Sequence, residues 1–210
     1  MKKSMTKKDT DYWNSYYKKK VAPTNPSDFA KYINSKIDSP KIILDVGCGN
    51  GRDSYYFSNQ GHTVIALDNS EEALKQITSS TFGKIPTICS DVSNLEITKP
   101  FVDVVYSRFS LHSLDEESYA NSLNVVYNIL NLQGLFCIEV RSVEDELYGE
   151  GKSLGTNTFE TDHSRRFFTL ESLLSDLRAR GFEIKYSDCQ HGWAPYKDLD
   201  PKVIRVVCEK

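Results

Sequence analysis

The stretch IILDVGCGNGR, which occupies residues 42–52, decides how this chain folds. Apolar residues surround Asp45 as they do in a short buried strand, and glycines then stand at positions 47, 49 and 51. In an open parallel sheet, ligands bind beyond the carboxyl ends of the strands, and glycines in the first strand-to-helix turn let the main chain approach the ligand. The stretch therefore predicts a strand, a bare turn and a nucleotide-type ligand beside it.

Short apolar runs alternate with helix-length segments on the C-terminal side of this stretch. The apolar runs are 42–46, 63–67, 85–89, 102–106 and 135–140, and the predicted helices between them are 53–60, 70–79 and 115–132. A further helix is predicted over 170–180, with strands near 182–186 and 203–208. This alternation is typical of an α/β fold whose sheet is mostly parallel.

Two predicted helices precede the glycine-rich stretch, and an irregular segment follows the fifth strand. The first helix spans 9–20 and has aromatic residues on one face, and the second begins after Ser27 and ends before Pro40. Residues 142–166 are polar without a regular period, so we expect a long loop that carries function or moves. We predict one domain over 1–210, with a helical lid at 1–40 and a substrate-side insertion at 142–168.

Composition and charge narrow the class of protein. The formal net charge of −3 gives no broad basic surface for nucleic acid. No segment has the roughly 20 apolar residues that cross a bilayer, and no apolar region follows the basic N-terminus as in a secretory signal. The five cysteines are far apart, which favours buried, reduced thiols. We expect a cytoplasmic monomer or homodimer that binds neither nucleic acid nor membranes.

The residues around the glycines favour a ligand with a positively charged end. A dinucleotide-binding turn reads G-x-G-x-x-G, and here Arg52 stands where the third glycine would fall. Asp45 would repel a pyrophosphate but could serve the cationic amino-acid part of S-adenosylmethionine. Asp68 ends the second predicted strand, where it can accept hydrogen bonds from ribose hydroxyls. Asp91 follows the third strand and is placed to receive the amine of adenine.

These motifs resemble those of the class I S-adenosylmethionine-dependent methyltransferases. The resemblance rests on residues 45–51, 90–92 and 101–106 together with Asp68, and it covers roughly residues 41–140. It implies a Rossmann-like sheet of seven strands, mostly parallel with an antiparallel last strand, beneath a helical N-terminal cap. It also implies S-adenosylmethionine as the cofactor, with methionine near Asp45 and Gly47, ribose on Asp68 and adenine near Asp91.

The predicted binding residues fall into two groups, one for the cofactor and one for the methyl acceptor. The cofactor is expected to contact Asp45, Gly47, Gly49, Asn50, Gly51, Arg52, Asp68, Asn69, Asp91, Val92, Ser107 and Tyr16. The acceptor is expected to contact Tyr17, Arg141, His163, Arg165 and Arg166. The adjacent arginines 165 and 166 would form a fork for a phosphate or carboxylate if both point inward, and a solvated face otherwise.

His112 and Arg108 follow the fourth strand and are the catalytic candidates. Histidine has an unperturbed pKa near physiological pH, so His112 could remove a proton from the acceptor; alternatively it only forms a hydrogen bond within the turn. Arg108 either binds an anionic acceptor or fixes the loop through a carboxylate. No histidine spacing indicates a metal site, and none is expected.

The N-terminal helix allows two interpretations. It could close over the cofactor, so that Tyr16 or Tyr17 contacts the sulfonium by a cation–π interaction. Alternatively, its aromatic face simply packs on the sheet.

The sequence therefore predicts a methyltransferase that acts on an oxygen or nitrogen atom of a small, polar metabolite, either neutral or anionic. Segments 162–168, 193–196 and 200–201 resemble bacterial methyltransferases of surface-polysaccharide or secondary-metabolite pathways. A non-catalytic regulatory module that binds the same cofactor is one alternative, and a protein substrate is another. An NAD-dependent oxidoreductase is disfavoured by Asp45 and Arg52.

Overall fold

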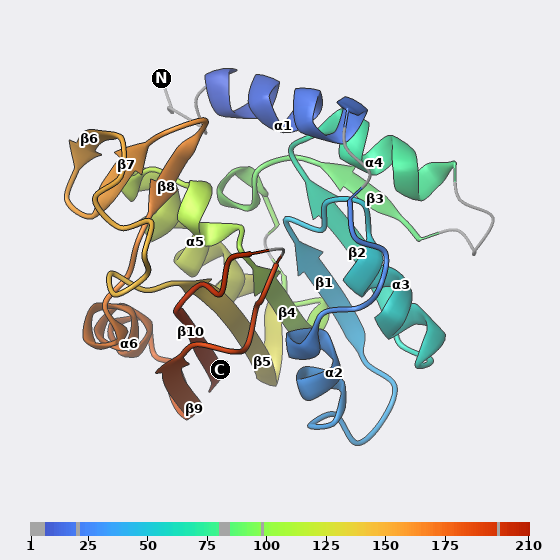
Figure 1. Ribbon diagram of the computed structural model, residues 1–210. Helices are drawn as coiled ribbons and strands as arrows, with labels where there is room; N and C mark the ends of the chain where they lie inside the picture. The colour runs from blue at the N-terminus through green and yellow to red at the C-terminus, as the bar shows by residue number, and fades with distance from the viewer. Residues whose placement is uncertain (1–6, 20–21, 80–84, 98, 197) are drawn as a thin grey trace.

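The computed structural model describes residues 7–19, 22–79, 85–97, 99–196 and 198–210, apart from the side chain of Lys7 (Figure 1). Its main sheet has seven strands in the order β3-β2-β1-β4-β5-β10-β9, and a small second sheet has the order β6-β7-β8. The strands are β1 (Ile42–Val46), β2 (Thr63–Asp68), β3 (Thr87–Cys89), β4 (Val102–Arg108), β5 (Leu130–Arg141), β6 (Lys152–Gly155), β7 (Thr158–Glu160), β8 (Ser164–Arg166), β9 (Glu183–Gln190) and β10 (Val203–Glu209).

Four of the α-helices begin directly after a side chain that caps them. Ser27, which precedes the second predicted helix, accepts a hydrogen bond from the Ala30 amide, and Thr169 accepts one from the Ser172 amide. The helices are α1 (Lys7–Lys19), α2 (Asp28–Asn34), α3 (Arg52–Asn59), α4 (Glu71–Thr78), α5 (Glu116–Ile129) and α6 (Leu170–Ala179), with short 3-10 turns η1 (Val92–Asn94) and η2 (Leu111–Ser113).

The predicted sheet is confirmed. β1 pairs in parallel with β2 and β4, β2 with β3, and β4 with β5, whereas β10 is antiparallel to both of its neighbours. The chain leaves β1 toward β2 on one side and returns on the other side at β4. β1 is therefore the switch point of the strand order, where an open α/β sheet forms its binding crevice.

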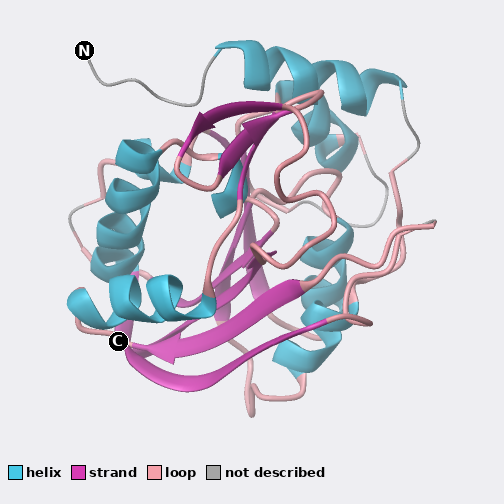
Figure 2. Cartoon of the chain, turned by 60° about the vertical axis from the view of Figure 1, so that its left-hand side comes forward, coloured by secondary structure: helices cyan, strands magenta, loops and turns pink. Residues whose placement is uncertain are grey.

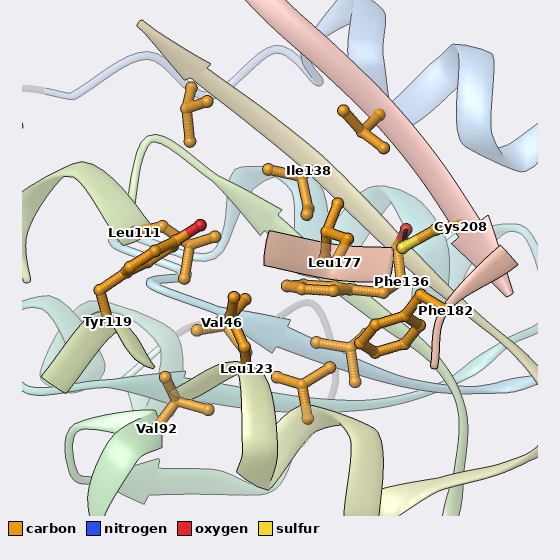
Figure 3. Close-up of a cluster of buried hydrophobic side chains, with 14 of the residues drawn as sticks. Val46, Val92, Leu111, Tyr119, Leu123, Phe136, Ile138, Leu177, Phe182 and Cys208 are labelled. Atoms are coloured by element: carbon orange, nitrogen blue, oxygen red, sulfur yellow. Dashed lines mark hydrogen bonds between the residues drawn. The ribbon is translucent and has the colours of Figure 1, made fainter. Parts of the chain in front are cut away.

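Helices cover both faces of the main sheet because successive strand residues point to opposite sides (Figure 2). Leu44 and Val105 belong to the cluster that packs against α5 and α6, part of which is drawn in Figure 3. Their neighbours Ile43 and Val104 belong to the opposite cluster, which packs against α2, α3 and α4. The strands are thus buried on both faces, as their almost continuous apolar runs predicted.

Residues 142–166 are a correction to the sequence analysis, because they contain β6, β7 and β8 rather than a long loop. These strands have only three or four residues each and no clear alternation of polar and apolar residues. An aromatic cluster supports them: the ring centroids of Tyr148, Phe159 and Phe167 lie 5.2 to 6.1 Å apart. The small sheet therefore depends on tertiary packing that a local pattern does not reveal.

The predicted helix over 115–132 was too long by three residues at its C-terminal end. The helix α5 ends at Ile129, and Leu130 already pairs with Val102 in the sheet. Asn131 donates a hydrogen bond to Asp103 at 2.8 Å, which fixes the start of β5.

The helix α1 lies across the carboxyl ends of the parallel strands, between the small sheet and α4 (Figure 1). The described residues contain no helix that is both long and apolar enough to cross a membrane.

Candidate active site

Two neighbouring cavities open at the carboxyl ends of the strands. The first, called here the Asp91 cavity, has a volume of about 90 Å³ and is lined by Asp68, Asp91 and Val92 among others. The second, called here the arginine cavity, has a volume of about 480 Å³ and contains Arg108, Arg141 and Arg165. The residues that line both cavities are Trp13, Tyr17, Gly47 and Phe109. A molecule that spans both cavities would pass these four residues.

The structure brings most of the predicted site residues to these cavities. The Asp91 cavity is lined by Gly47, Asp68, Asn69, Asp91, Val92 and Tyr17. The arginine cavity is lined by Asp45, Gly47, Gly49, Asn50, Arg52, Tyr16, Tyr17, Arg108, His112, Arg141, His163 and Arg165. Three predicted residues line neither cavity: Gly51, Ser107 and Arg166. Gly51 caps α3 in the left-handed conformation, and Ser107 forms a 2.6 Å hydrogen bond with Ser110.

The glycine-rich turn allows close approach of other elements. Gly47 and Gly49 have φ angles of 70° and 55°, which side chains rarely adopt. A Cβ atom on Gly49 would lie 2.2 Å from the hydroxyl oxygen of Tyr17, and one on Gly47 would lie 2.3 Å from the Cβ of Ser110. Glycine is therefore required so that α1 and the segment after β4 can close over the turn.

The carboxylate of Asp68 is fixed at the border of the Asp91 cavity. It accepts hydrogen bonds from the amides of Gly49 at 2.9 Å and Ser70 at 2.8 Å. Burial raises the pKa of Asp68, and these amide hydrogen bonds partly oppose the rise. The carboxylate therefore has a set orientation, and its remaining lone pairs can accept from hydroxyl groups.

Asp91 presents a carboxylate oxygen that has no hydrogen-bond partner among the described residues. Its Oδ1 accepts a hydrogen bond from the Ser93 amide at 2.8 Å and caps η1. Its Oδ2 is buried and has no hydrogen-bond partner among the described residues. Burial raises the pKa of this carboxyl group. Because unpaired buried acceptors are costly, this oxygen marks a place for a ligand donor such as an amine.

Asp45 is a buried acid at the wall of the arginine cavity. It accepts a hydrogen bond from the Ser54 hydroxyl at 2.5 Å. Burial and, next, the nearby charge of Asp53 raise the pKa of Asp45 to about 7. Asp53 itself accepts from Ser27 and from the Tyr106 hydroxyl at 2.9 Å. A cation placed beside Asp45 would relieve this unfavourable burial of negative charge.

His112 lies in the arginine cavity near its border with the first cavity. Its ring centroid lies 5.8 Å from that of Phe109 and 6.4 Å from that of His163, and its Nδ1 has no partner among the described residues. Burial, followed by the charges of His163 and Arg141, holds the pKa of His112 well below its usual value. The imidazole is therefore neutral and can accept a proton, although it is a weaker base than free histidine.

His163 has a similar environment. Its Nδ1 lies 3.1 Å from Oδ1 of Asp162, but off the line of a hydrogen bond. Burial and the charge of Arg165 lower the pKa of His163 to about 4, so this ring is also neutral near pH 7.

The two adjacent arginines do not form the fork that was one of the two alternatives in the sequence analysis. Arg165 lines the arginine cavity, where it donates to Asp162 at 2.8 Å. Arg166 lines a separate cavity of about 180 Å³, with its guanidinium 5.1 Å from the ring centroid of Tyr119. Consecutive residues of the strand β8 face opposite sides, so the pair cannot form one fork.

The helix α1 is tied to elements on both sides of the site. Tyr12 donates to Asp162 at 2.7 Å and Asp9 accepts from the Ser164 amide at 3.1 Å, on the side of the small sheet. Asn14 accepts from the Ser70 hydroxyl at 2.8 Å on the side of α4. The helix thus covers both cavities.

Sequence analysis missed several residues of the site. Trp13 and Phe109 line both cavities, and Phe109 has a positive φ of 53°, which is rare for a bulky residue. Glu139 stands inside the apolar run of β5 and is fully buried. A charged residue within a predicted buried strand is a signal, because such a residue needs a partner.

No cluster of metal-binding side chains is present in the part of the chain that the structure describes.

Comparison with known sequences points to one class of enzyme. Residues 43–134 match the model of a family described as a methyltransferase domain. Protein arginine N-methyltransferase 1 of Dictyostelium discoideum is 32% identical over 131 residues, which are 57% of this chain and 38% of that enzyme. An uncharacterized methyltransferase of Synechocystis is 25% identical over 156 residues, which are 72% of this chain and 71% of that protein. The chain thus covers much less than two thirds of the Dictyostelium enzyme.

Solved structures share the fold. An S-adenosylmethionine-dependent methyltransferase from Methanosarcina mazei superposes with a TM-score of 0.75 at 19% identity, over 85% of this chain and 96% of that one. The 1,6-didemethyltoxoflavin-N1-methyltransferase of Burkholderia thailandensis superposes with a TM-score of 0.68 at 24% identity, over 87% of this chain and 76% of that one. The Burkholderia structure contains 1,6-didemethyltoxoflavin and S-adenosylhomocysteine. At these identities the likeness concerns the fold.

Proposed function

Because this chain carries a class I methyltransferase domain, we propose that it transfers the methyl group of S-adenosylmethionine to an oxygen or nitrogen atom of a small, polar, anionic metabolite. The observation that carries the proposal is the meeting of the two cavities at Gly47 and Phe109. The Asp91 cavity has carboxylates that can accept hydrogen bonds from a nucleoside, and the arginine cavity has cationic side chains and a histidine.

The residues present fit the cofactor. Asp91 offers a buried, unpartnered oxygen to the adenine amine, and the fixed carboxylate of Asp68 can accept from the ribose hydroxyls. Asp45 is the proposed partner of the ammonium group of the methionine part, because it lines the arginine cavity on the other side of Gly47 from Asp68 and Asp91. When bound there, S-adenosylmethionine supplies an electrophilic methyl group on a sulfonium.

The chain's own contribution is to orient the acceptor and exclude water. Alignment of two reactants can contribute roughly 7 to 11 kcal/mol toward lowering the barrier. The aromatic rings of Trp13, Tyr17 and Phe109 surround the junction, and α1 covers it. His112 is the residue that takes the acceptor's proton, since it is neutral and lies on the acceptor side of the junction.

A small acceptor fits this site better than a protein chain. The arginine cavity is bounded by α1 on one side and by Pro195, Tyr196 and Leu199 on another. A small acceptor in this cavity would contact both segments at once. The same cavity favours an enzyme over a regulatory module, because a module needs only the cofactor site.

Two measurements test the proposal. Calorimetry should show that S-adenosylhomocysteine binds to the protein, and that Asp68→Ala abolishes this binding while Glu71→Ala, on the first turn of α4, does not. Methyl transfer from labelled cofactor to a library of anionic metabolites should then identify acceptors. Absence of cofactor binding refutes the proposal, and binding without transfer to any compound favours the regulatory module.

A further inference from the structure

Three charged residues lie side by side across the middle of the main sheet. Arg108 on β4 is in register with Glu139 on β5, and Glu139 is in register with Arg205 on β10. Directly paired residues point to the same face of a sheet, so their side chains meet. This set is called here the charge ladder.

Ion pairs of short length connect the charge ladder. The Nε of Arg108 lies 2.7 Å from Oε1 of Glu139, and the Nε of Arg205 donates to Oε2 of the same carboxylate at 2.6 Å. The side chains of Glu139 and Arg205 are 0% and 6% exposed, whereas that of Arg108 is 20% exposed. Arg108 is therefore the end of the ladder that reaches the arginine cavity.

Charge balance distinguishes Arg108 from the other arginines of the cavity. Arg141 has its own carboxylate at Asp145, and Arg165 has one at Asp162. The fourth arginine of the cavity, Arg52, has its Nε 3.8 Å from a carboxylate oxygen of Asp53. Glu139, by contrast, is shared between two guanidinium groups. Within these ion pairs, the ladder has one positive charge more than it has negative charges, and that excess lies beside the cavity.

The free edge of Arg108 matches a group with two oxygens. The Nε of Arg108 lies against Oε1 of Glu139 but off the line of a hydrogen bond, and the terminal nitrogens form no hydrogen bond among the described residues. A guanidinium edge binds a carboxylate or phosphate through two parallel hydrogen bonds. The ring of Phe109 lies 4.6 Å below the guanidinium and restricts its movement.

We propose that Arg108 binds an oxyanion group of the acceptor and that Glu139 is the positioning residue that sets its orientation. This inference rests on the proposed function and adds to it the site and the chemistry of acceptor recognition. Arg205 connects the same carboxylate to Trp193, which directly precedes the cavity-lining residues Ala194 and Pro195. Its Nη2 donates to the Trp193 carbonyl at 3.0 Å, and its guanidinium lies 4.5 Å from the Trp193 ring. The segment after β9 and the anion site therefore depend on one buried glutamate.

Binding of simple anions to the protein saturated with S-adenosylhomocysteine tests this proposal. The probes are acetate, benzoate, inorganic phosphate, phenyl phosphate and the neutral benzamide, each titrated by calorimetry. We expect at least one oxyanion to bind and benzamide not to bind. Preference for benzoate or for phenyl phosphate identifies the group as carboxylate or phosphate.

Variants locate the site. Arg108→Gln should weaken the binding of the oxyanion by about tenfold or more, because a charge-assisted pair of hydrogen bonds is lost. Glu139→Gln should weaken this binding by several-fold, and Glu139→Asp should weaken it less than Glu139→Gln does. Arg166→Gln is the matched control, since that guanidinium lines the separate cavity, and it should leave anion binding unchanged.

The outcomes separate this inference from the proposed function. Failure of S-adenosylhomocysteine to bind to the wild-type protein overturns both. If it binds but no oxyanion does, or if Arg108→Gln and Arg166→Gln behave alike, only the present inference is overturned. Should Glu139→Gln fail to fold, Arg108→Gln and Arg108→Lys still decide it, because the lysine keeps the charge and loses the fork.

Discussion

Lowering the pH below 7 should weaken the binding of S-adenosylhomocysteine, because Asp45 takes up a proton there. Burial and the charge of Asp53 raise the pKa of Asp45 to about 7 in the free protein. The ammonium of the ligand favours the ionised carboxylate, so the pKa must fall on binding. Below pH 7 the free protein is mostly protonated at Asp45 and must lose this proton to bind.

The magnitude follows from the pKa. For each pH unit below the pKa of Asp45, the binding free energy of S-adenosylhomocysteine becomes about 1.4 kcal/mol less favourable, which is roughly a factor of ten in the dissociation constant. Between pH 8 and pH 5.5 the dissociation constant should therefore rise roughly 30-fold. Histidine does not account for such a change, because the pKa of His112 is well below its usual value and that of His163 is about 4.

Calorimetry across this pH range is the assay. Titrations at pH 6 in two buffers of different ionisation enthalpy should show release of nearly one proton per bound ligand. The Asp45→Asn variant should bind more weakly at pH 8 and show no such dependence on pH. A wild-type dissociation constant that stays level from pH 8 to pH 5.5 would refute the reasoning.

Three further predictions concern single side chains. Asp91→Ala should lower the affinity for S-adenosylhomocysteine about tenfold, as measured by calorimetry. The control Asp115→Ala removes a comparable helix cap and should lower only the melting temperature, as measured by thermal unfolding. Gly49→Ala should destabilise the protein by at least about 1 kcal/mol, seen as a fall in Tm of roughly 2 to 4 °C per kcal/mol, because the left-handed turn and the Tyr17 hydroxyl leave no room for a methyl group. His112→Ala should reduce kcat by roughly 10²- to 10⁴-fold in a labelled-methyl assay while the affinity for S-adenosylhomocysteine stays within about twofold.

Each of these predictions has a contrary result. Equal ligand affinities for Asp91→Ala and Asp115→Ala would remove the assignment of adenine to Asp91. An unchanged Tm for Gly49→Ala would mean that α1 does not rest on the turn. An unchanged kcat for His112→Ala would leave the imidazole with a role inside the turn alone.

The parts of the fold that the sequence predicted are those set by local patterns. The apolar runs of the parallel strands are buried on both faces, so their composition alone identifies them. The caps at Ser27 and Thr169 were also visible, because a single hydroxyl before an amphipathic segment is enough to predict a helix start. The positions of Asp68 and Asp91 were predictable for the same reason, since Asp68 ends β2 and Asp91 stands two residues after β3.

The acceptor side depends on pairings between distant residues. Arg165 and Arg166 are adjacent in sequence, but they line different cavities because both belong to the strand β8, in which consecutive side chains face opposite sides. Glu139 meets Arg108 and Arg205, which are far from it along the chain, through the register of three strands. Sequence spacing contains no information on that register. The sequence shows that a glutamate interrupts the apolar run of β5, but it does not show which arginines pair with that glutamate.

The positions of the two tryptophans give the protein its own optical reporters. Trp13 lies at the junction of both cavities, and the ring of Trp193 lies against the guanidinium of Arg205. With Trp193→Phe, the emission of the remaining indole would report on the occupancy of the junction without an attached dye, and stopped-flow fluorescence on that variant would time the arrival of a ligand there.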